Sequence, residues 1–338
     1  MKNYKAIGKI GEGTFSEVMK MQSLRDGNYY ACKQMKQRFE SDRKSGSLAL
    51  ICELMDMNIY ELIRGRRYPL SEKKIMHYMY QLCKSLDHIH RNGIFHRDVK
   101  PENILIKQDV LKLGDFGSCR SVYSKQPYTE YISTRWYRAP ECLLTDGFYT
   151  YKMDLWSAGC VFYEIASLQP LFPGVNELDQ ISKIHDVIGT PAQKTLTKFK
   201  QSRAMNFDFP FKKGSGIPLL TTNLSPQCLS LLHAMVAYDP DERIAAHQAL
   251  QHPYFQEQRL SMTKEGLGAV WKRDPEALCR RAAAHSGHRQ LRLRGDHRAQ
   301  ALLSHILEQP VSSVTAPKDR FKMETTSLAE QREHGAAE

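Results

Sequence analysis

Residues 96–103 read His-Arg-Asp-Val-Lys-Pro-Glu-Asn (HRDVKPEN), and this stretch decides the fold. Asp115–Gly117 (DFG) follows it, twelve positions beyond the closing asparagine. Ala139–Glu141 (APE) and then Asp154–Gly159 (DLWSAG) come next along the chain. One short motif carries little weight, but four in this order, with these residue types and spacings, do not coincide by chance. The four stretches are therefore interpreted together.

These motifs resemble those of the protein kinase family, and the resemblance runs from about Tyr4 to Phe255. It implies an α+β, bilobal kinase domain over residues 4–258. The small β-rich N-lobe would cover about 4–54, and the larger helical C-lobe about 58–258. Residues 259–338 would form a basic and largely disordered tail, since they are rich in Ala, Arg, His, Gln and Glu with few aromatics.

The resemblance also explains the residue types of the central motif. Phosphoryl transfer has a loose transition state, so a kinase supplies position and charge rather than covalent steps. By resemblance, Asp98 accepts the hydrogen bond and proton of the substrate hydroxyl, and Lys100 meets the γ-phosphate, as in serine/threonine kinases. Asn103 and Asp115 would hold Mg²⁺ ions that bridge the ATP phosphates. ATP and Mg²⁺ are the implied cofactors, and proteins the implied substrates.

The stretch Gly11–Val18 (GEGTFSEV) is a glycine-rich turn between two predicted strands. Its glycines allow backbone N–H groups to approach phosphate oxygens. Alone the signal is weak, because similar turns join hairpins that bind nothing, and Ser16 stands where a third glycine is frequent. The nucleotide-binding residues that the resemblance implies are Ile10, Gly11, Gly13, Val18, Lys33, Glu53 and Met55.

Thr129 and Tyr131 flank Glu130 in the interval between DFG and APE. A bare Thr-Glu-Tyr means nothing, but in this interval the resemblance implies a dual phosphorylation site, filled by an upstream kinase or by autophosphorylation. A phosphate there would meet Arg97 and Arg120 through charge-assisted hydrogen bonds and order the loop.

The same interval ends in Thr134–Glu141 (TRWYRAPE). Together with the preceding Thr-x-Tyr, this resembles the mitogen-activated and cyclin-dependent kinase branch, and within it the male-germ-cell-associated group. Thr134 and Arg138 would position the substrate, with Arg138 favouring proline after the phosphorylated residue. Glu141 would form a buried, structural ion pair with Arg243.

The chain departs from the family pattern between Lys33 and Cys52, which lie only nineteen positions apart. The family places a helix, αC, and a further strand in this interval. Only about ten residues, 37–46, are left after the flanking strands, whereas a helix, a strand and their turns need roughly 25. The sequence therefore predicts that αC and one strand are missing, and an internal deletion such as alternative splicing is a hypothesis for their loss.

The missing helix normally supplies the glutamate partner of the strand lysine. Glu40 and Asp42 are the only nearby acids, and they stand in a polar turn. The chain could still close as a hairpin, because the lysine strand and the hinge strand are neighbours in the family sheet. We expect a sheet face without its covering helix and a Lys33 without its orienting ion pair. The alternative function is therefore a catalytically impaired, kinase-fold binding module.

Hydrophobic periodicity gives the local elements. Residues 4–36 alternate as strands, with a hairpin at Asp26-Gly27. Residues 47–53 (SLALICE) predict one more buried strand. Apolar residues at helical spacing, with a suitable start at Ser71, predict a helix over 71–90. Two short apolar runs within 104–113 predict a further hairpin.

Composition sets wider limits on the 338 residues, of which 41% are hydrophobic and 25% charged. The net charge of +11 also allows nucleic-acid binding, but the basic residues are dispersed, so this third class of function is weaker. Eight scattered cysteines indicate no disulfide framework, and no apolar run reaches the roughly 20 residues of a membrane span. We expect a non-membrane protein of the cytoplasm and nucleus, with a chaperone or scaffold as a further partner; a cilium is implied by the group resemblance only.

Overall fold

A computed structural model provides the structure of this chain. Tyr131 and residues 262–338 of the expected tail lie outside the described part, so the disorder expected of the tail stays a prediction. The structure describes residues 3–13, 16–41, 44–129, 134–199, 208–218 and 224–261.

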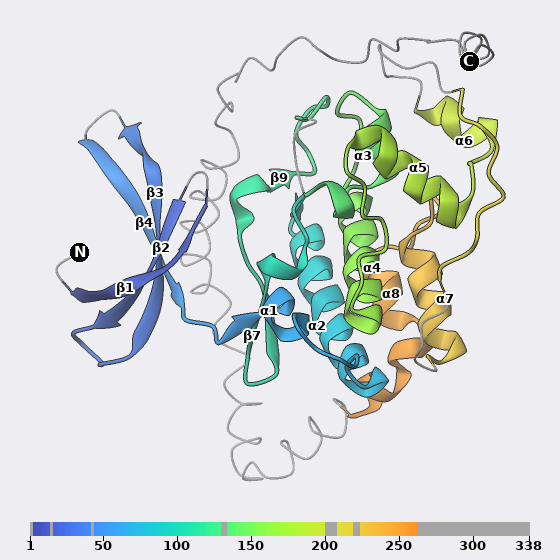
Figure 1. Ribbon diagram of the computed structural model, residues 1–338. Helices are drawn as coiled ribbons and strands as arrows, with labels where there is room; N and C mark the ends of the chain where they lie inside the picture. Colours follow the sequence, from blue (N-terminus) through green and yellow to red (C-terminus); the bar gives the residue numbers. More distant parts are fainter. Residues whose placement is uncertain are drawn as a thin grey trace, which may run out of the picture.

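The N-terminal region is a four-stranded antiparallel sheet with the order β1-β2-β3-β4 (Figure 1). The turn between β2 and β3 contains the predicted Asp26-Gly27 pair. Gly27 has a positive φ of 73° and donates its N–H to the Ser23 carbonyl at 3.0 Å, while the Asp26 carboxylate accepts the Asn28 N–H at 3.0 Å. The strands are β1 (Tyr4–Glu12), β2 (Ser16–Ser23), β3 (Tyr29–Ser41) and β4 (Lys44–Glu53).

Strand β3 passes into β4 with no helix between them, as the spacing predicts. The register runs from Tyr30 opposite Glu53 to Ser41 opposite Lys44, with an irregularity between Gln34 and Arg38. The strand predicted over 47–53 therefore exists and begins earlier than expected.

The prediction that this strand is buried is wrong. Strand β4 is the edge of the sheet, its described side chains from 48 to 51 are only partly covered, and Cys52 and Glu53 are exposed. The physical reason is the missing αC and strand, because no described element covers β4 in their place.

The remainder of the described chain is mainly helical. Ser71 caps the predicted helix by accepting the Lys74 N–H at 3.4 Å, and the apolar stripe of that helix faces the core. Helix α4 is buried on nearly all sides, which makes it the centre of the lobe (Figure 1). The helices are α1 (Ile59–Ile63), α2 (Glu72–Arg91), α3 (Pro140–Leu144), α4 (Lys152–Ser167), α5 (Glu177–Ile188), α6 (Gln193–Lys198), α7 (Pro226–Met235) and α8 (Ala246–Gln251).

Short strands lie on the side of this lobe that faces the sheet (Figure 1). The predicted hairpin over 104–113 is present, and its turn places Gln108 and Asp109 at φ values of 48° and 66°. Two small sheets result, with the order β5-β7-β8 and the pair β6-β9. The strands are β5 (Met57–Asn58), β6 (Ile94–Phe95), β7 (Ile104–Lys107), β8 (Val110–Leu113) and β9 (Arg120–Ser121).

The hydrophobic core lies in the helical lobe. Its cluster of buried side chains begins at Ile59 and continues to Phe255. Among the described residues before Ile59, only Met21 and Cys32 are buried apolar side chains. The α+β architecture, a small sheet followed by a larger helical lobe, is confirmed. No helix in the described ranges is both long and apolar enough to cross a membrane.

Candidate active site

The backbone of the HRD stretch, between β6 and β7, is held by a buried carboxylate. Asp154 of α4 is fully buried and accepts the N–H of His96 on one oxygen and that of Arg97 on the other, both at 2.8 Å. Arg97 has a left-handed φ of 68°. Burial would raise the pKa of Asp154, but the hydrogen bond from His90 and nearby positive charge outweigh it and lower that pKa. The carboxylate therefore stays ionised as an anchor.

One oxygen of the Asp98 carboxylate has partners within the chain, and the other has none among the described residues. Its Oδ2 accepts a hydrogen bond from Asn103 Nδ2 at 3.0 Å and lies 2.9 Å from Lys100 Nζ. Asn103 Nδ2 also donates to the Asp98 carbonyl at 2.8 Å, and Lys100 Nζ reaches Thr134 Oγ1 at 3.3 Å. The buried Oδ1 of Asp98 has no hydrogen-bond partner among the described residues. Such an atom is an acceptor available to a donor from outside the chain.

Asp115 lies across from the sheet in the left-handed region, at φ 55°. Its Oδ1 is 2.5 Å from Lys33 Nζ on β3 and accepts the Gly117 N–H at 3.3 Å. Burial raises the pKa of the Asp115 carboxyl, but the hydrogen bond and charge of Lys33 more than offset this and lower it. Lys33 therefore does have an ion pair, with Asp115, which is a different partner from the glutamate that the family places on αC.

The glycine-rich turn joins β1 to β2 above this pair. Gly11 is opposite Val18, and Val18 is opposite Lys33, so the three share one face of the sheet. Gly13 donates its N–H to the Ser16 carbonyl at 2.8 Å. Ile10 is half-exposed on β1. Three of the predicted nucleotide residues, Gly11, Val18 and Lys33, are thus neighbours on the sheet. The tip of the turn, at residues 14 and 15, lies outside the described part.

The hinge segment leads from β4 to β5. Met55 is partly buried there, and the Asp56 N–H donates to the Ile106 carbonyl at 3.0 Å. Glu53, at the end of β4, forms ion pairs with Lys107 at 3.4 Å and with Lys112. Glu53 and Met55, both predicted to bind the nucleotide, therefore lie where the chain passes from the sheet to the helical lobe.

One tyrosine links the activation segment to the HRD stretch. The Tyr149 hydroxyl accepts a hydrogen bond from Arg97 Nη1 at 2.8 Å and donates one to the Thr129 carbonyl at 2.7 Å. The Thr129 side chain is exposed. Burial and the nearby charge of Arg97 lower the pKa of Arg120, so the two arginines lie close enough to repel each other. Arg97 is the one of the two that the structure links to Thr129, through Tyr149. Tyr131 lies outside the described residues.

The predicted substrate-positioning residues follow the activation segment. Thr134 is exposed and contacts Lys100, as described above. The Arg138 side chain is nearly buried, and its Nη1 donates to Glu177 Oε1 at 2.9 Å, at the start of α5. The ion pair with Glu177 thereby holds the Arg138 side chain against the start of α5.

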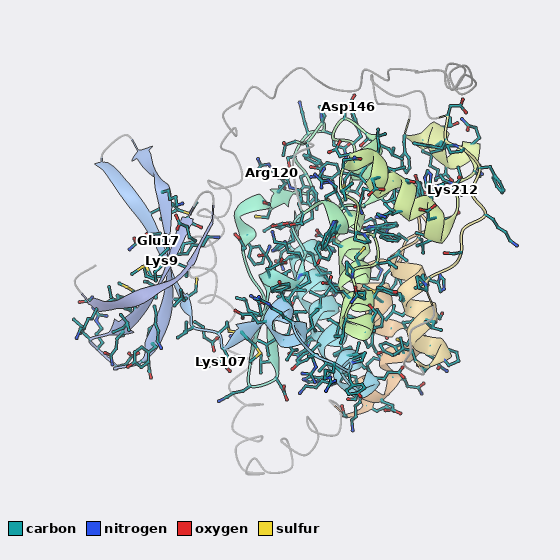
Figure 2. The ribbon with its side chains drawn as sticks, viewed as in Figure 1. Lys9, Glu17, Lys107, Arg120, Asp146 and Lys212 are labelled. Atoms are coloured by element: carbon teal, nitrogen blue, oxygen red, sulfur yellow. The ribbon has the colours of Figure 1, made fainter. Side chains whose placement is uncertain are left out.

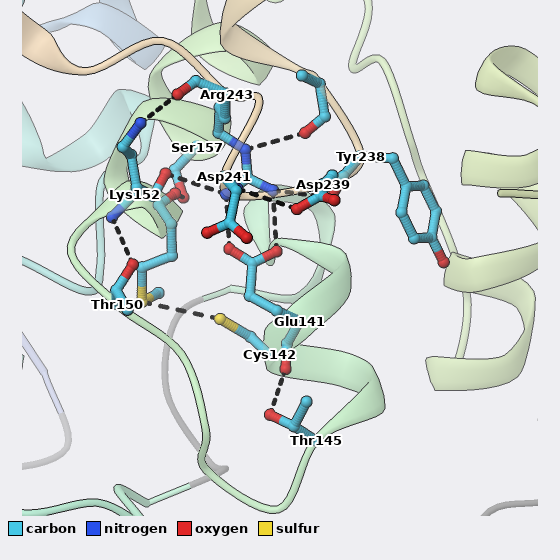
Figure 3. A network of polar contacts seen from close by, with 12 residues as sticks. Glu141, Cys142, Thr145, Thr150, Lys152, Ser157, Tyr238, Asp239, Asp241 and Arg243 are labelled. Carbon is cyan, nitrogen blue, oxygen red and sulfur yellow. Dashed lines mark hydrogen bonds and ion pairs between the residues drawn. The ribbon is translucent and has the colours of Figure 1, made fainter. Parts of the chain in front are cut away.

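The predicted buried ion pair below the site is confirmed (Figure 3). Arg243 donates to both Glu141 oxygens, at 2.5 and 2.8 Å, and the two side chains are 0% and 1% exposed. Arg243 also donates to the carbonyls of Ala237, Lys152 and Tyr238. Such complete hydrogen bonding is what allows a charged pair to lie in a protein interior.

Three side chains at the site are ones that no sequence motif marks. Tyr149 joins Arg97 to Thr129, Glu177 orients Arg138, and Lys112 holds the Glu53 carboxylate. Only Glu177 has a local signal, because an acidic residue at a helix start is common. The other two are brought to the site by chain folding.

Comparison with known proteins agrees with this geometry. The protein kinase domain family matches residues 39–255. The MAPK/MAK/MRK overlapping kinase of Homo sapiens is 87% identical over 299 residues, covering 80% of this chain and 71% of the relative. The Mus musculus protein of the same name is 85% identical, over 78% of this chain and 70% of the relative. The serine/threonine-protein kinase MAK of Homo sapiens is 36% identical, over 76% of this chain and 46% of the relative.

The coverage also bears on the missing segment. Since 80% of 338 residues is about 270, the 299 aligned residues exceed what this chain contributes by about 29, roughly the length of a helix, a strand and their turns. The motifs, the bilobal α+β fold and these relatives agree with one another. The chain belongs to the protein kinase family, as a serine/threonine protein kinase of the group that contains the MAPK/MAK/MRK overlapping kinase and MAK.

Proposed function

We propose that this chain transfers the γ-phosphate of ATP to serine or threonine hydroxyls of proteins, with Asp98 as the catalytic base. The observation that carries the proposal is the asymmetry of the Asp98 carboxylate. Oδ2 is held by Asn103 and Lys100, while the buried Oδ1 has no partner among the described residues. An acceptor held in this way suits a substrate hydroxyl, which must lie within hydrogen-bond distance of its base.

The donor set suits Mg²⁺. The Asp115 carboxylate and the Asn103 side-chain oxygen are hard oxygen donors, and Mg²⁺ is held by one or two carboxylates together with substrate phosphates. When bound, Mg²⁺ neutralises the charge that develops on the phosphate oxygens. Lys33 supplies a positive charge beside Asp115, and Lys100 supplies a second beside Asp98. The chain thus contributes orientation and charge.

Activation-loop phosphorylation is the proposed control. The Thr129 carbonyl is tied through Tyr149 to Arg97, and Arg97 and Arg120 repel each other. A phosphate on Thr129 would relieve that repulsion and order the segment through charge-assisted hydrogen bonds. Tyr131 is the second proposed phosphorylation site, with an upstream kinase or the chain itself as donor.

Substrate selection is proposed to be proline-directed. Arg138 is fixed by Glu177, and Thr134 contacts the lysine that stands beside Asp98. These contacts support the proposal that Thr134 and Arg138 position the substrate, with Arg138 favouring proline after the phosphorylated residue. The cytoplasm and nucleus remain the proposed compartments, and the cilium rests on group resemblance alone.

A second candidate function is a kinase-fold binding module of low activity, acting on kinase partners or substrates through a scaffold or chaperone. The observation that favours it is the direct passage from β3 to β4. Without αC, Lys33 pairs with Asp115 itself, so the two nucleotide-handling groups occupy each other. A misplacement of about 1 Å can cost on the order of 10²-fold in rate.

A kinase assay on the full chain separates the two candidates. We expect Asp98→Asn to lose about 10²- to 10⁴-fold in rate, which is the usual contribution of a general base. The matched control is Asp208→Asn, an exposed aspartate far from the site in sequence. Equal activity in Asp98→Asn and the unmodified chain would contradict the proposal. A thermal shift with ATP and Mg²⁺ but no turnover would favour the binding module, because a ligand of the folded state raises its stability.

A further inference from the structure

The Glu53 carboxylate lies between two ammonium groups. Oε1 faces Lys107 Nζ at 3.4 Å, and Oε2 is paired with Lys112 Nζ. Glu53 is the last residue of β4, whereas the lysines belong to β7 and β8, so both contacts cross from the sheet to the helical lobe. Lys107 lies on the part of that lobe nearest the sheet (Figure 2). The hydrogen bonds from Lys112 and then Lys107 lower the pKa of the Glu53 carboxyl.

The cluster of Glu53, Lys107 and Lys112 lies at the start of the hinge, the segment that joins the sheet to the helical lobe. The chain crosses between the lobes at residues 54–56, and the Asp56 N–H donates to the Ile106 carbonyl on β7. A restraint placed on Glu53 therefore acts on the start of the same segment. The hinge is therefore held at both ends. The Glu53 side chain is paired with two lysines at its start, and the Asp56 N–H is bonded to β7 at its end.

Few other contacts hold the lobes in place. In the described part of the chain, the other ion pair between the sheet and the helical lobe is Lys33–Asp115. That pair consists of the groups proposed to serve the ATP phosphates and Mg²⁺, so the bound nucleotide and metal would compete for the same charges. The Glu53 cluster uses no such group and can persist throughout the reaction.

We propose that the Glu53 side chain is a positioning residue for ATP, because its ion pairs with Lys107 and Lys112 fix the angle of the hinge that carries Glu53 and Met55, both predicted to bind the nucleotide. This inference rests on the proposed function for the nucleotide site, and assigns a role to the charge of the Glu53 side chain. Single exposed ion pairs contribute little. Here two ion pairs share the Glu53 carboxylate, and both restrain the same motion, the bending of the three-residue hinge. Their combined effect should therefore appear in the affinity for the nucleotide.

The first test measures the dissociation constant of Mg-ATP for the full chain by titration. Glu53→Gln keeps the size of the side chain and removes its charge, and we expect about 3- to 10-fold weaker binding, within the usual range of coupling between sites. Lys112→Met should weaken binding by a similar factor. The matched controls Lys73→Met and Glu257→Gln alter exposed charges remote in sequence from the hinge and should stay within about 2-fold.

A charge swap makes the test specific. Glu53→Lys alone places three positive charges together, and should weaken binding more than Glu53→Gln does. Combining it with Lys112→Glu restores an opposite pair and should recover affinity to within about 3-fold of the unmodified chain, since directly contacting residues are energetically coupled. High salt should narrow these differences, because the groups are exposed. Turnover at saturating ATP should change less than the KM for ATP.

Unchanged affinity in Glu53→Gln, or a swap no better than its worse single variant, would overturn the inference. Failure of the unmodified chain to bind Mg-ATP would instead contradict the proposed function. Hydrogen exchange at Asp56 then reads the hinge restraint directly: faster exchange in Glu53→Gln than in Glu257→Gln supports the restraint, and equal exchange overturns it as well.

Discussion

The helical lobe and the N-terminal sheet supply the same active site but are built on very different amounts of buried apolar surface. The lobe has a continuous core from Ile59 to Phe255, organised around a helix that is buried on nearly every side. The described sheet has Met21 and Cys32 as its buried apolar side chains. Backbone pairing therefore holds the sheet together, while side-chain packing holds the lobe together.

This contrast in packing means that the two lobes position different groups of the active site. Asp98 and Asn103 are positioned by the packed lobe, through Asp154 of its central helix, and need nothing from the sheet. Lys33 is positioned by the sheet, and its nearest fixed partner is Asp115 of the other lobe. Loss of the αC segment therefore affects how the nucleotide is held before it affects the base.

The largest expected effect tests the packed lobe. Arg243→Met leaves the Glu141 carboxylate buried without its partner, and we expect a loss of about 3–5 kcal/mol in the free energy of unfolding. Arg25→Met, an exposed arginine of the sheet, should change it by no more than about 0.5 kcal/mol. Chemical denaturation measures both. A loss below 1 kcal/mol for Arg243→Met would mean that the lobe does not depend on this pair.

Lowering the pH is expected to reduce the free energy of unfolding by about 3 kcal/mol. Burial, followed by the charge of Lys212, lowers the pKa of His185 to about 4, and the ring lies 3.0 Å from the Tyr238 hydroxyl with Asp186 beside it. The unfolded chain, with an ordinary value near 6.5, binds the proton first, so stability should fall as the pH drops from 6.5 to 4 by about 3 kcal/mol.

Denaturation as a function of pH measures this loss. His185→Phe should flatten the decline between pH 6.5 and 4, whereas His247→Gln, an exposed histidine of the same lobe, should leave it unchanged. If stability fell equally with pH in His185→Phe and in the unmodified chain, groups other than His185 would be responsible for the acid sensitivity.

The smallest expected effect is the difference in lost stability between matched substitutions in the two regions. Met153 is 0% exposed in α4, and Met21 is 4% exposed in the sheet. Met153→Ala should cost about 2–5 kcal/mol, and Met21→Ala about 1–3 kcal/mol less, since a thinly covered site can collapse around the lost atoms. Equal losses in denaturation would show that the sheet is as tightly packed as the lobe, and the contrast would fail.

Sequence patterns predicted the parts of this fold that depend on local chemistry. The helix that begins after Ser71 follows from its cap and its apolar spacing, and the hairpin over 104–113 follows from two short apolar runs. The distance from Lys33 to Cys52 was enough to predict the missing helix, because chain length limits what can fit.

The rest depends on which side chains the fold brings together. Residues 47–53 were predicted as buried from their apolar composition, but burial requires a covering layer, and composition does not report whether one exists. Asp115 as the partner of Lys33 lies 82 positions away. Tyr149 reaches Arg97 from 52 positions away. Contacts of this kind leave no local mark, although the residues of the HRD stretch themselves were found by motif alone.

The left-handed backbone at Arg97 makes the shape of the catalytic loop a consequence of helix α4. A non-glycine residue with this φ costs on the order of 1–3 kcal/mol and persists only where its surroundings impose it. Here Asp154 imposes it by accepting two successive N–H groups. Asp154 thus stabilises a strained loop conformation although it is not itself a proposed substrate or nucleotide contact. A conservative substitution of Asp154, deep in the lobe, would therefore be expected to reduce phosphoryl transfer at the catalytic loop.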